Sequence, residues 1–331
     1  MVNKKLRIIF FGTPEVAANF LKDATKTEAV LCVFTQSDKP KGRKLMLTAS
    51  AVKTAALKLS LPVYQPEKLS NEDVKIIKNF KPDVGVVVAY GKLIPQSVFS
   101  IPLYGCFNIH FSLLPKYRGA APVQWALING ESKTGVSSFW LEKTLDSGPV
   151  LVQKEMSVLP QDSAKELFEK LTTLGIEVMH ETLDKIKKGD CAGIKQEGTV
   201  TVAHSLKKSD GFIKWQKNAQ DILNLIRGTN PWPSAHTAMV LNAQTTTFKV
   251  IGAKIFTGPI GENFVCGQLI SILPKKGIVI ACGLGALLIE TVHPANKVVV
   301  GADIFAINNK IPLGFIFEQY ESVEKIFGGM K

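Results

Sequence analysis

The 331-residue chain has little of what marks several common protein classes. Its five cysteines, at positions 32, 106, 191, 266 and 282, form no Cys-x-x-Cys pair, and no histidine stands at zinc-finger spacing. We therefore expect reduced, mostly buried thiols and no bound metal. The longest apolar runs, such as Val84 to Ala89, are far shorter than the roughly 20 residues that cross a bilayer. A membrane helix is not expected.

The amino terminus lacks the pattern of an export signal. Met1 to Arg7 leads into a strand-like run, without the longer apolar segment and small-residue cleavage site of a signal peptide. We therefore expect a cytoplasmic protein. The chain has no internal repeat and no low-complexity tract, and its 46% of apolar residues are enough for two hydrophobic cores. A soluble protein of two domains is predicted.

A glycine-rich nucleotide loop is also missing. Gly12-Thr-Pro-Glu15 lies between the first predicted strand and the first predicted helix, where such a loop would be, but it contains a single glycine. The chain has neither G-x-G-x-x-G nor a Walker lysine pattern at this turn, which disfavours NAD or ATP binding.

Negative charge is scarce, because 40 Lys and Arg residues exceed 28 Asp and Glu residues and give a formal charge of +12. This excess attracts a polyanion, which can be nucleic acid, a phosphorylated metabolite or an anionic membrane surface. Charge alone does not choose among them. A basic surface that serves only solubility is the alternative.

Strand-like and helical patterns alternate through the first 190 residues. This order is typical of βαβ units and predicts a Rossmann-like α/β domain with a parallel sheet at 1–190. A polar, weakly periodic linker is expected at 191–209. Short β-like runs separated by Gly, Asn and Pro then predict a smaller OB-like β-barrel domain at 210–331.

Polar and apolar residues alternate from Phe107 to Ser112. Because strand side chains point to opposite faces in turn, Asn108, His110 and Ser112 are expected to share one face. Asn108 offers an amide donor and His110 a titratable imidazole, which Asp146 can orient. This set suits acyl transfer to an amine, in which an oxyanion needs fixed donors and the attacking nitrogen loses a proton. A structural histidine is the alternative for His110 taken by itself.

The residues around this set resemble the signature of the folate-dependent formyltransferases. The motifs are Asn108-x-His110, Ser112-Leu-Leu-Pro115, Tyr117-Arg-Gly-Ala-Ala-Pro122 and Leu145-Asp-Ser-Gly148. The resemblance implies that Asn108 and protonated His110 steady the formyl oxyanion, and that Asp146 positions His110 and assists proton removal through water. It also implies 10-formyltetrahydrofolate as formyl donor and no metal. The implied folate-binding residues are Tyr90, Gly91, Ser112, Leu113, Leu114 and Pro115.

Further motifs resemble the branch of this family that acts on methionyl-tRNA. They include Phe11-Gly-Thr-Pro14, Gly42-Arg-Lys-Leu-Met46 and Asn230-Pro-Trp-Pro-Ser-Ala235, so the resemblance covers nearly the whole chain. It implies formylation of the α-amino group of methionyl-initiator tRNA by an enzyme whose C-terminal domain binds tRNA. We expect a monomer.

The resemblance places the acceptor end of the tRNA at a basic loop after the second strand. The basic residues of this loop are Lys39, Lys41, Arg43 and Lys44. Such side chains neutralise phosphates, and a merely solvated charged loop is the alternative. The C-terminal domain offers weaker candidates, because surface lysines are ordinary: Lys249, Lys254, Lys275, Lys276 and Lys297.

Other functions use the same trio of residues. A two-domain relative can formylate a UDP-amino-sugar, and a hydrolase can transfer the formyl group of 10-formyltetrahydrofolate to water. The basic loop argues against both. A catalytically silent RNA-binding protein is a third alternative, which the presence of Asn108, His110 and Asp146 disfavours.

Overall fold

The computed structural model describes residues 5–41, 46–241, 244–261 and 263–318. Its contacts divide the chain into two compact units. Unit 1 comprises Met1–Pro122, Lys133–Ser157 and Phe168–Ala203, and unit 2 comprises Val123–Ser132, Val158–Leu167 and His204–Lys331. Neither unit is continuous in sequence, because two short internal segments group with the C-terminal part of the chain.

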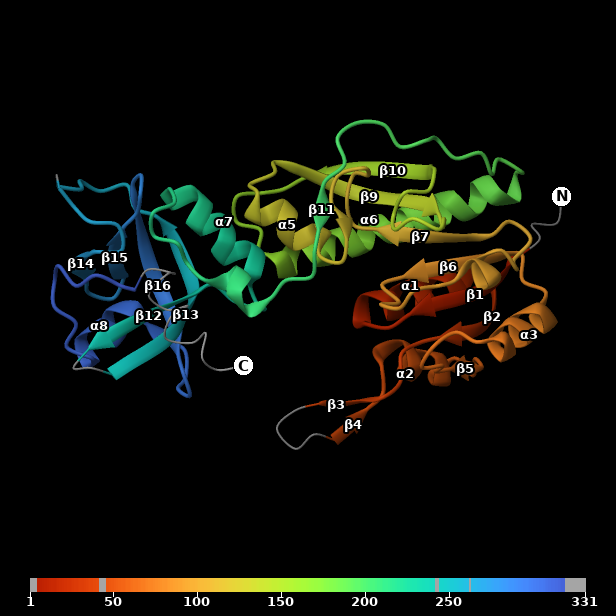
Figure 1. Cartoon of the computed structure of the whole chain (residues 1–331), viewed down its shortest axis with the longest axis horizontal. Helices are drawn as coiled ribbons and strands as arrows, with labels where there is room; N and C mark the ends of the chain where they lie inside the picture. Colours follow the sequence, from red (N-terminus) through yellow and green to blue (C-terminus); the bar gives the residue numbers. More distant parts are fainter. Residues whose placement is uncertain (1–4, 42–45, 242–243, 262, 319–331) are drawn as a thin grey trace. The chain divides into compact units, whose positions relative to one another are not determined.

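Unit 1 is built on a seven-stranded sheet in the order β10-β9-β7-β6-β1-β2-β5 (Figure 1). Its strands are β1 (Arg7–Gly12), β2 (Ala29–Phe34), β5 (Val63–Tyr64), β6 (Val84–Val88), β7 (Cys106–His110), β9 (Lys133–Trp140) and β10 (Val150–Ser157). The sheet is parallel, as predicted, except that β9 runs opposite to both of its neighbours. The loop from β9 to β10 is too short for a crossover helix, and it therefore joins antiparallel strands.

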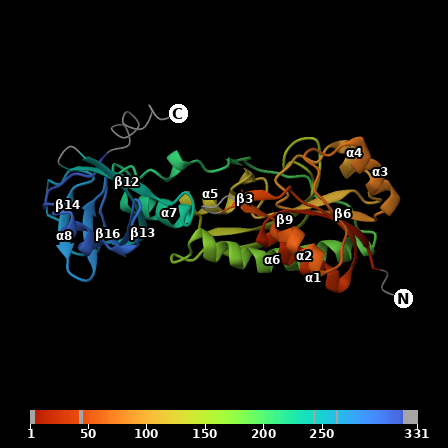
Figure 2. The same ribbon diagram turned by 90° about the horizontal axis from the view of Figure 1, so that it is seen from below.

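Helices cover both faces of this sheet. They are α1 (Glu15–Thr27), α2 (Ala51–Lys58), α3 (Asn71–Phe80), α4 (Gln96–Phe99) and α6 (Ala164–Lys187). Figure 2 shows α1, α2 and α6 on one side and α3 and α4 on the other. Every residue of β6 is buried, which explains the continuous apolar run in its sequence. Ile9 and Phe11 of β1 pack in one core cluster with Ile77 of α3.

The helix starts follow local signals in the sequence. Ser50 caps α2 by accepting a hydrogen bond from the Lys53 backbone N–H. Ser70 and Asp73 form a reciprocal capping box at the start of α3. Each such cap contributes on the order of 1 kcal/mol to helix stability. Polar residues at these positions therefore fix where the covering helices begin.

Unit 2 contains an antiparallel sheet of six strands and two main helices. The elements are β12 (His236–Leu241), β13 (Gln244–Ile255), β14 (Leu269–Leu273), β15 (Gly277–Ala281), β16 (Ala286–Pro294), β17 (Val300–Gly301), α7 (Ala219–Thr229) and α8 (Ala302–Asn308). The Glu318 N–H donates to Ala238 of β12, while Phe317 and Phe315 bond to Gly267 and Leu269. One segment thus connects both edges of the sheet, which is curled into a half-barrel.

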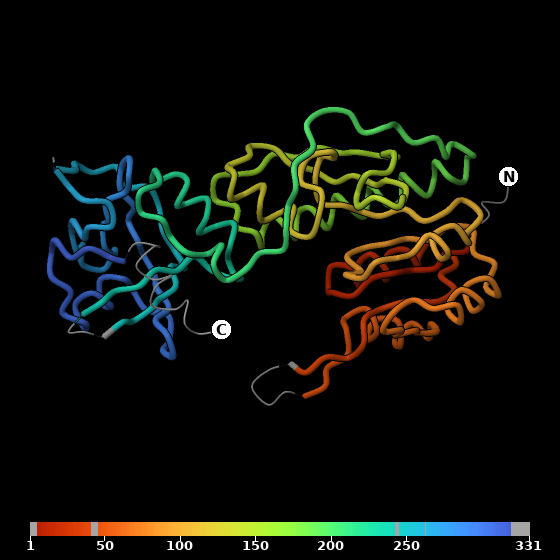
Figure 3. The backbone as a smooth tube through the Cα atoms, viewed as in Figure 1, coloured from red at the N-terminus to blue at the C-terminus, as the bar shows by residue number. Residues whose placement is uncertain are grey.

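Residues 191–203, which we name the strap, lie within the region where the sequence predicts a linker. The strap belongs to unit 1. Its strand β11 (Val202–Ala203) pairs in parallel with β8 (Arg118–Gly119), and Ile194 pairs with Val150 of β10. Figure 3 shows the strap as a green segment that runs along unit 1.

The five cysteines are free thiols, as predicted, and three of them are buried. Burial raises the pKa of Cys32 to about 12, which makes this thiol unreactive. Among the described helices, none combines the length and apolar character needed to cross a membrane. The described residues also contain no group of three or more His, Cys, Asp or Glu side chains placed to hold a metal ion.

Candidate active site

A cavity of about 620 Å³ lies beyond the carboxyl ends of β6 and β7 in unit 1. This is the edge of an open α/β sheet at which ligands bind. Three stretches line most of the cavity: residues 87–94 at and after the end of β6, residues 108–111 at and after the end of β7, and residues 141–146 after β9. Phe139 and Phe168 add apolar wall, which the sequence interpretation did not assign to the site. The volume and lining suit an aromatic small molecule.

The structure brings Asn108, His110 and Asp146 together in the wall of this cavity. Asn108 and His110 come from the same strand, and Asp146 reaches them from the loop after β9. His110 Nδ1 lies 3.9 Å from Asp146 Oδ2. The two residues are only 5% and 9% exposed, so charges on them interact through a medium of lower dielectric than water.

The orientation of the His110 ring is set by a backbone carbonyl. His110 Nε2 lies 2.8 Å from the carbonyl oxygen of Tyr117. Because a carbonyl oxygen can only accept, Nε2 carries a hydrogen and donates it. Nδ1 is therefore the nitrogen that faces Asp146. At 3.9 Å the pair is an ion pair when the ring is protonated, but it is too long for a direct hydrogen bond.

The Asp146 carboxylate is held by the neighbouring Gly119 loop. The Gly119 backbone N–H donates to Asp146 Oδ2 over 2.7 Å. Asp146 has a φ of +49° and Ala89, in the same cavity wall, a φ of +44°. Left-handed backbone at residues other than glycine is costly and concentrates at functional sites. The backbone of this turn is therefore held in place by the structure around it.

Gln196 in the strap is a contact that the sequence interpretation missed. Its Nε2 donates to the carbonyls of Asp146 and Gly148, over 2.9 and 2.8 Å. Its Oε1 accepts from Arg118 Nε and Nη2, over 3.1 and 2.7 Å. A glutamine in a polar, weakly periodic segment gives no sequence signal of such contacts. The strap is thus bonded directly to the turn that carries Asp146.

Two of the six residues predicted for folate, Tyr90 and Gly91, line the cavity. The Tyr90 carbonyl accepts from Thr13 Oγ1 over 2.8 Å and from Gln36 Nε2 over 2.9 Å. Burial raises the pKa of the Tyr90 phenol to about 12, and its hydroxyl contacts no polar partner among the described residues. Tyr90 is therefore neutral and contributes shape rather than charge.

The other four predicted folate residues, Ser112, Leu113, Leu114 and Pro115, follow the cavity wall in sequence but are outside its described lining. Strand β7 ends at His110, so Ser112 does not continue the strand face that Asn108 and His110 share. The Ser112 hydroxyl donates to the Lys116 carbonyl over 2.6 Å. Ser112 thus closes a loop, which begins at Phe111 in the cavity wall.

The predicted basic loop begins and ends in a short hairpin. Its strands are β3 (Lys39–Lys41) and β4 (Met46–Thr48). Lys39 Nζ donates to Gln36 Oε1 over 2.7 Å, and Gln36 connects through its Nε2 to the Tyr90 carbonyl. The base of the hairpin is therefore bonded to the wall of the cavity. Lys41 is described in its backbone only, and Arg43 and Lys44 lie outside the described residues.

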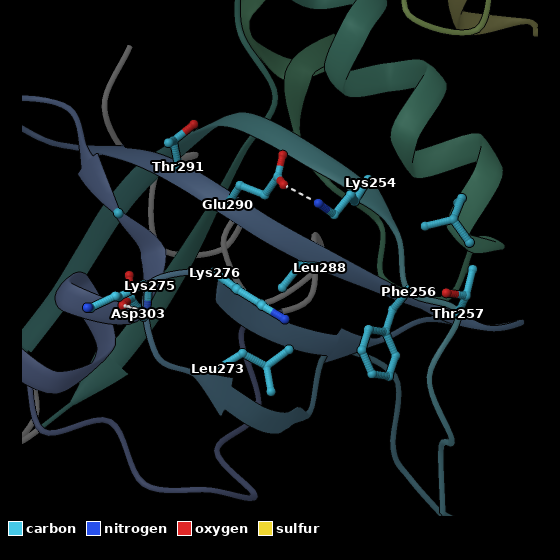
Figure 4. Close-up of a pocket in the computed structure, with 12 residues that line it drawn as sticks. Lys254, Phe256, Thr257, Leu273, Lys275, Lys276, Leu288, Glu290, Thr291 and Asp303 are labelled. Atoms are coloured by element: carbon cyan, nitrogen blue, oxygen red, sulfur yellow. Dashed lines mark hydrogen bonds and ion pairs between the residues drawn. The ribbon is translucent and has the colours of Figure 1, made fainter.

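A second cavity, of about 630 Å³, lies on the sheet of unit 2. Three of the five lysines singled out from the sequence line it together: Lys254, Lys275 and Lys276. Figure 4 shows Lys254 joined to Glu290 on the neighbouring strand, with Nζ and Oε1 2.6 Å apart. Lys249 and Lys297 are not among its described lining residues.

Comparison with known proteins decides the family. Residues 4–183 match the model of the formyl transferase domain, and residues 205–309 match that of the formyl transferase C-terminal domain. The chain belongs to the formyltransferase family. The methionyl-tRNA formyltransferase of Thermodesulfovibrio yellowstonii is 42% identical over 309 residues, which cover 93% of this chain and 97% of that protein. The methionyl-tRNA formyltransferase of Endomicrobium trichonymphae is 40% identical over 315 residues, with 93% and 99% covered.

A solved formyltransferase shares the fold at much lower identity. The N-formyltransferase from Helicobacter canadensis, in complex with folinic acid and dTDP-3-aminofucose, superposes with a TM-score of 0.62 and 16% identity. The match covers 88% of this chain and 99% of that chain. The family models and the two relatives confirm the resemblance found in the sequence motifs, and the solved structure confirms the fold.

Proposed function

We propose that the protein transfers the formyl group of 10-formyltetrahydrofolate to the α-amino group of methionyl-initiator tRNA, for translation initiation. The observation that carries this function is the 42% identity with a methionyl-tRNA formyltransferase over 93% of the chain. The meeting of Asn108, His110 and Asp146 at one cavity supports the chemistry independently of that name.

The cavity of unit 1 is the binding site for the folate. Its apolar walls suit an aromatic ring system, and Tyr90 and Gly91 form part of them. Ser112, Leu113, Leu114 and Pro115 support the same wall, because they follow Phe111 directly. The folate relative bound to the similarly folded Helicobacter canadensis enzyme supports this assignment.

Each catalytic side chain has a role that follows from its position. 10-Formyltetrahydrofolate supplies the electrophilic formyl carbon. Asn108 donates its amide hydrogen to the formyl oxygen as negative charge develops there. Protonated His110 donates a second hydrogen to the formyl oxygen through Nδ1, since Nε2 already donates to the Tyr117 carbonyl. Asp146 stabilises the protonated ring and accepts, through water, the proton that the amine loses. The amine nitrogen bonds to the formyl carbon, the bond from that carbon to the folate nitrogen breaks, and this nitrogen takes up a proton.

The tRNA acceptor end meets the basic hairpin of unit 1, and unit 2 supplies further phosphate contacts. Lys39, Lys41, Arg43 and Lys44 are the hairpin residues that neutralise phosphates near the formyl donor. The bond from Lys39 through Gln36 to Tyr90 supports this role, because it fixes the hairpin base beside the folate cavity. In unit 2 the cavity lined by Lys254, Lys275 and Lys276 is the contact region.

The division of labour follows the boundaries predicted from the sequence. Residues 1–190 form the catalytic domain, 191–209 the connection, whose strap packs on the catalytic domain, and 210–331 the OB-like tRNA-binding domain. The bonds of the segment near Phe317 to both sheet edges support a barrel-like closure. The protein works as a monomer in the cytoplasm, where initiator tRNA meets the ribosome, and it uses no metal.

One assay tests this function against its rivals. The purified protein is supplied with 10-formyltetrahydrofolate and, in separate reactions, methionyl-tRNA, a UDP-amino-sugar or no acceptor besides water. We expect formylmethionyl-tRNA as the main product. Formylated sugar, or tetrahydrofolate with free formate as the only product, would identify the transferase or hydrolase alternative. RNA binding without any turnover would identify the catalytically silent one.

The hairpin assignment has its own test. Substitution of Arg43 by Ala removes one phosphate contact, so the log–log salt slope of tRNA binding should fall by about 0.9 or less. Folate binding should stay nearly unchanged. Loss of folate affinity in this variant would show that the basic segment serves the donor rather than the acceptor.

A further inference from the structure

The strap of residues 191–203 is hydrogen-bonded to the segments that hold His110 and Asp146 in place. Thr201 Oγ1 accepts from the Tyr117 N–H over 2.8 Å, and Tyr117 is the residue whose carbonyl orients His110. The Thr201 carbonyl accepts from the Arg118 N–H over 2.9 Å. Ile194 exchanges two backbone hydrogen bonds with Val150, just after the Asp146 loop. A segment that the sequence marks as a linker is therefore built into the site.

Gln196 is the strap side chain that reaches the Asp146 turn. The two acceptors of its Nε2 group, the carbonyls of Asp146 and Gly148, lie on either side of Ser147. Its carbonyl oxygen accepts two hydrogens from the Arg118 guanidinium, next to Gly119, whose N–H binds the Asp146 carboxylate. The Gln196 side chain therefore connects the turn Asp146 to Gly148 with the segment Arg118–Gly119, which binds the Asp146 carboxylate.

An amide is the chemical group that these contacts require. The Asp146 and Gly148 carbonyls need donors, while the Arg118 guanidinium needs an acceptor. Glutamate would serve Arg118 but would place a carboxylate against two carbonyl oxygens. Methionine has a similar length but offers no N–H donor. Two substitutions therefore test these bonds separately. Gln196→Glu keeps the acceptor for Arg118 and loses the N–H donor, and Gln196→Met loses both.

We propose that Gln196 is a positioning residue for formyl transfer, whose amide holds the turn Asp146 to Gly148 so that the Asp146 carboxylate faces His110 Nδ1. This inference rests on the proposed function for the reaction itself. Gln196 acts through Asp146 and is not in contact with the reacting atoms. Catalytic groups must be held to within about 0.5 Å of their productive geometry, and supporting hydrogen bonds are what hold them.

The experiment compares Gln196→Met and Gln196→Glu with the matched control Glu197→Gln, an exposed neighbour on the same strap. We expect kcat for formylmethionyl-tRNA to fall about tenfold or more in both Gln196 variants, because a displaced catalytic group slows the reaction steeply. The Michaelis constants for folate and tRNA should change by less than about threefold, since neither substrate touches Gln196 in this scheme. The control should match the wild type.

A second background shows whether Gln196 acts through Asp146. Combined with Asp146→Asn, the change Gln196→Met should lower kcat by less than about twofold, because the group that it positions is already inactive. Equal losses in the two backgrounds would mean that Gln196 only stabilises the fold and would overturn the proposal. Full activity of Gln196→Glu would overturn it as well, since only the two bonds from Arg118 survive in that variant.

A readout independent of turnover keeps this inference separate from the proposed function. The ring resonances of His110 in NMR spectra should move in Gln196→Met and stay in place in Glu197→Gln. If wild-type protein makes no formylmethionyl-tRNA, the proposed function is wrong, and the resonances still test whether Gln196 holds the Asp146 turn against His110. If Gln196→Met is folded, its His110 resonances do not move and its kcat is unchanged, the inference about Gln196 is wrong. The proposed function would be unaffected by that result.

Discussion

The two cavities have nearly the same volume, about 620 and 630 Å³, but among their described lining residues only the first has a buried ionisable pair. In unit 1 the ionisable pair His110 and Asp146 is buried, and each partner has a fixed hydrogen bond to backbone. In unit 2 the three lysines of the cavity lining are exposed, with 62% of the Lys254 side chain open to solvent. The first arrangement fixes geometry, while the second is a set of three exposed lysines that share the cavity lining with Glu290 and Asp303.

This difference determines how each site responds to change. The interaction between two buried charged groups depends steeply on their geometry, because the groups around them cannot rearrange freely to restore lost contacts. Exposed lysines contribute little individually, and salt screens them within about 10 Å at 0.1 M. We therefore expect steep, salt-independent effects on kcat in unit 1 and shallow, salt-dependent effects on tRNA affinity in unit 2.

The largest effects should come from the catalytic side chains themselves. His110→Ala removes the oriented imidazole and should lower kcat about 10²- to 10⁴-fold. Asn108→Ala removes one donor to the developing oxyanion and should lower kcat about 10²- to 10³-fold. Single-turnover formylation of methionyl-tRNA measures both, with His293→Ala in unit 2 as the control. Normal kcat in either variant would remove that residue from the mechanism.

A glycine beside Asp146 tests whether fixed geometry explains the behaviour of unit 1. A Cβ added at Gly148 would lie 1.8 Å from the Trp140 carbonyl oxygen, so the turn must shift in Gly148→Ala. Overpacking of this kind costs about 1–3 kcal/mol of unfolding free energy. We expect kcat to fall by about tenfold or more, as it does when a group is misplaced.

The control for this variant is Ser147→Ala, in which the added strain is absent and one bond to the Thr144 carbonyl is lost. Denaturant unfolding gives the stability change, and the formylation assay gives kcat. A Gly148→Ala protein that is destabilised but fully active would show that the Asp146 turn needs no fixed geometry.

Local patterns were sufficient to predict most of the unit 1 fold. The helix at Asn71–Phe80 has its capping residues at Ser70 and Asp73, and the fully apolar run Val84–Val88 forms a central strand. The reversed direction of β9 could not be predicted in this way, because strand direction depends on how the chain returns to the sheet. The pairing of β9 with β7 is a tertiary contact.

The candidate site was predictable where its residues share a strand or a motif. Asn108 and His110 lie on one strand face, and the motif around Asp146 brought that residue into the set. Gln196 was not predictable, because its contacts to Asp146, Gly148 and Arg118 join segments about 50 to 80 positions apart in sequence. Ser112 was placed on the strand face by extending the alternation beyond the true end of β7.

A smaller effect is expected where the basic hairpin meets the cavity of unit 1. Gln36→Glu keeps an acceptor for Lys39 but loses the N–H that donates to the Tyr90 carbonyl. A lost hydrogen bond of this kind is worth about 0.5–1.5 kcal/mol, so we expect kcat/KM for tRNA to fall about two- to tenfold. Gln96→Glu, which makes the same change at an exposed position, is the control. Unchanged kcat/KM would mean that the hairpin works without this link.

The smallest effects belong to the lysines of unit 2, and their order is itself a test. Lys254 is already paired with Glu290, so Lys254→Ala should weaken tRNA binding less than Lys276→Ala, whose side chain forms no ion pair with a described residue. Each lost phosphate contact should flatten the log–log salt slope by about 0.9. Binding titrations of tRNA at several salt concentrations measure these slopes, while kcat at saturating tRNA should stay at the wild-type value. If Lys276→Ala instead lowered kcat at every salt concentration, unit 2 would have to contribute geometry as well as charge, and the contrast between the two cavities would fail.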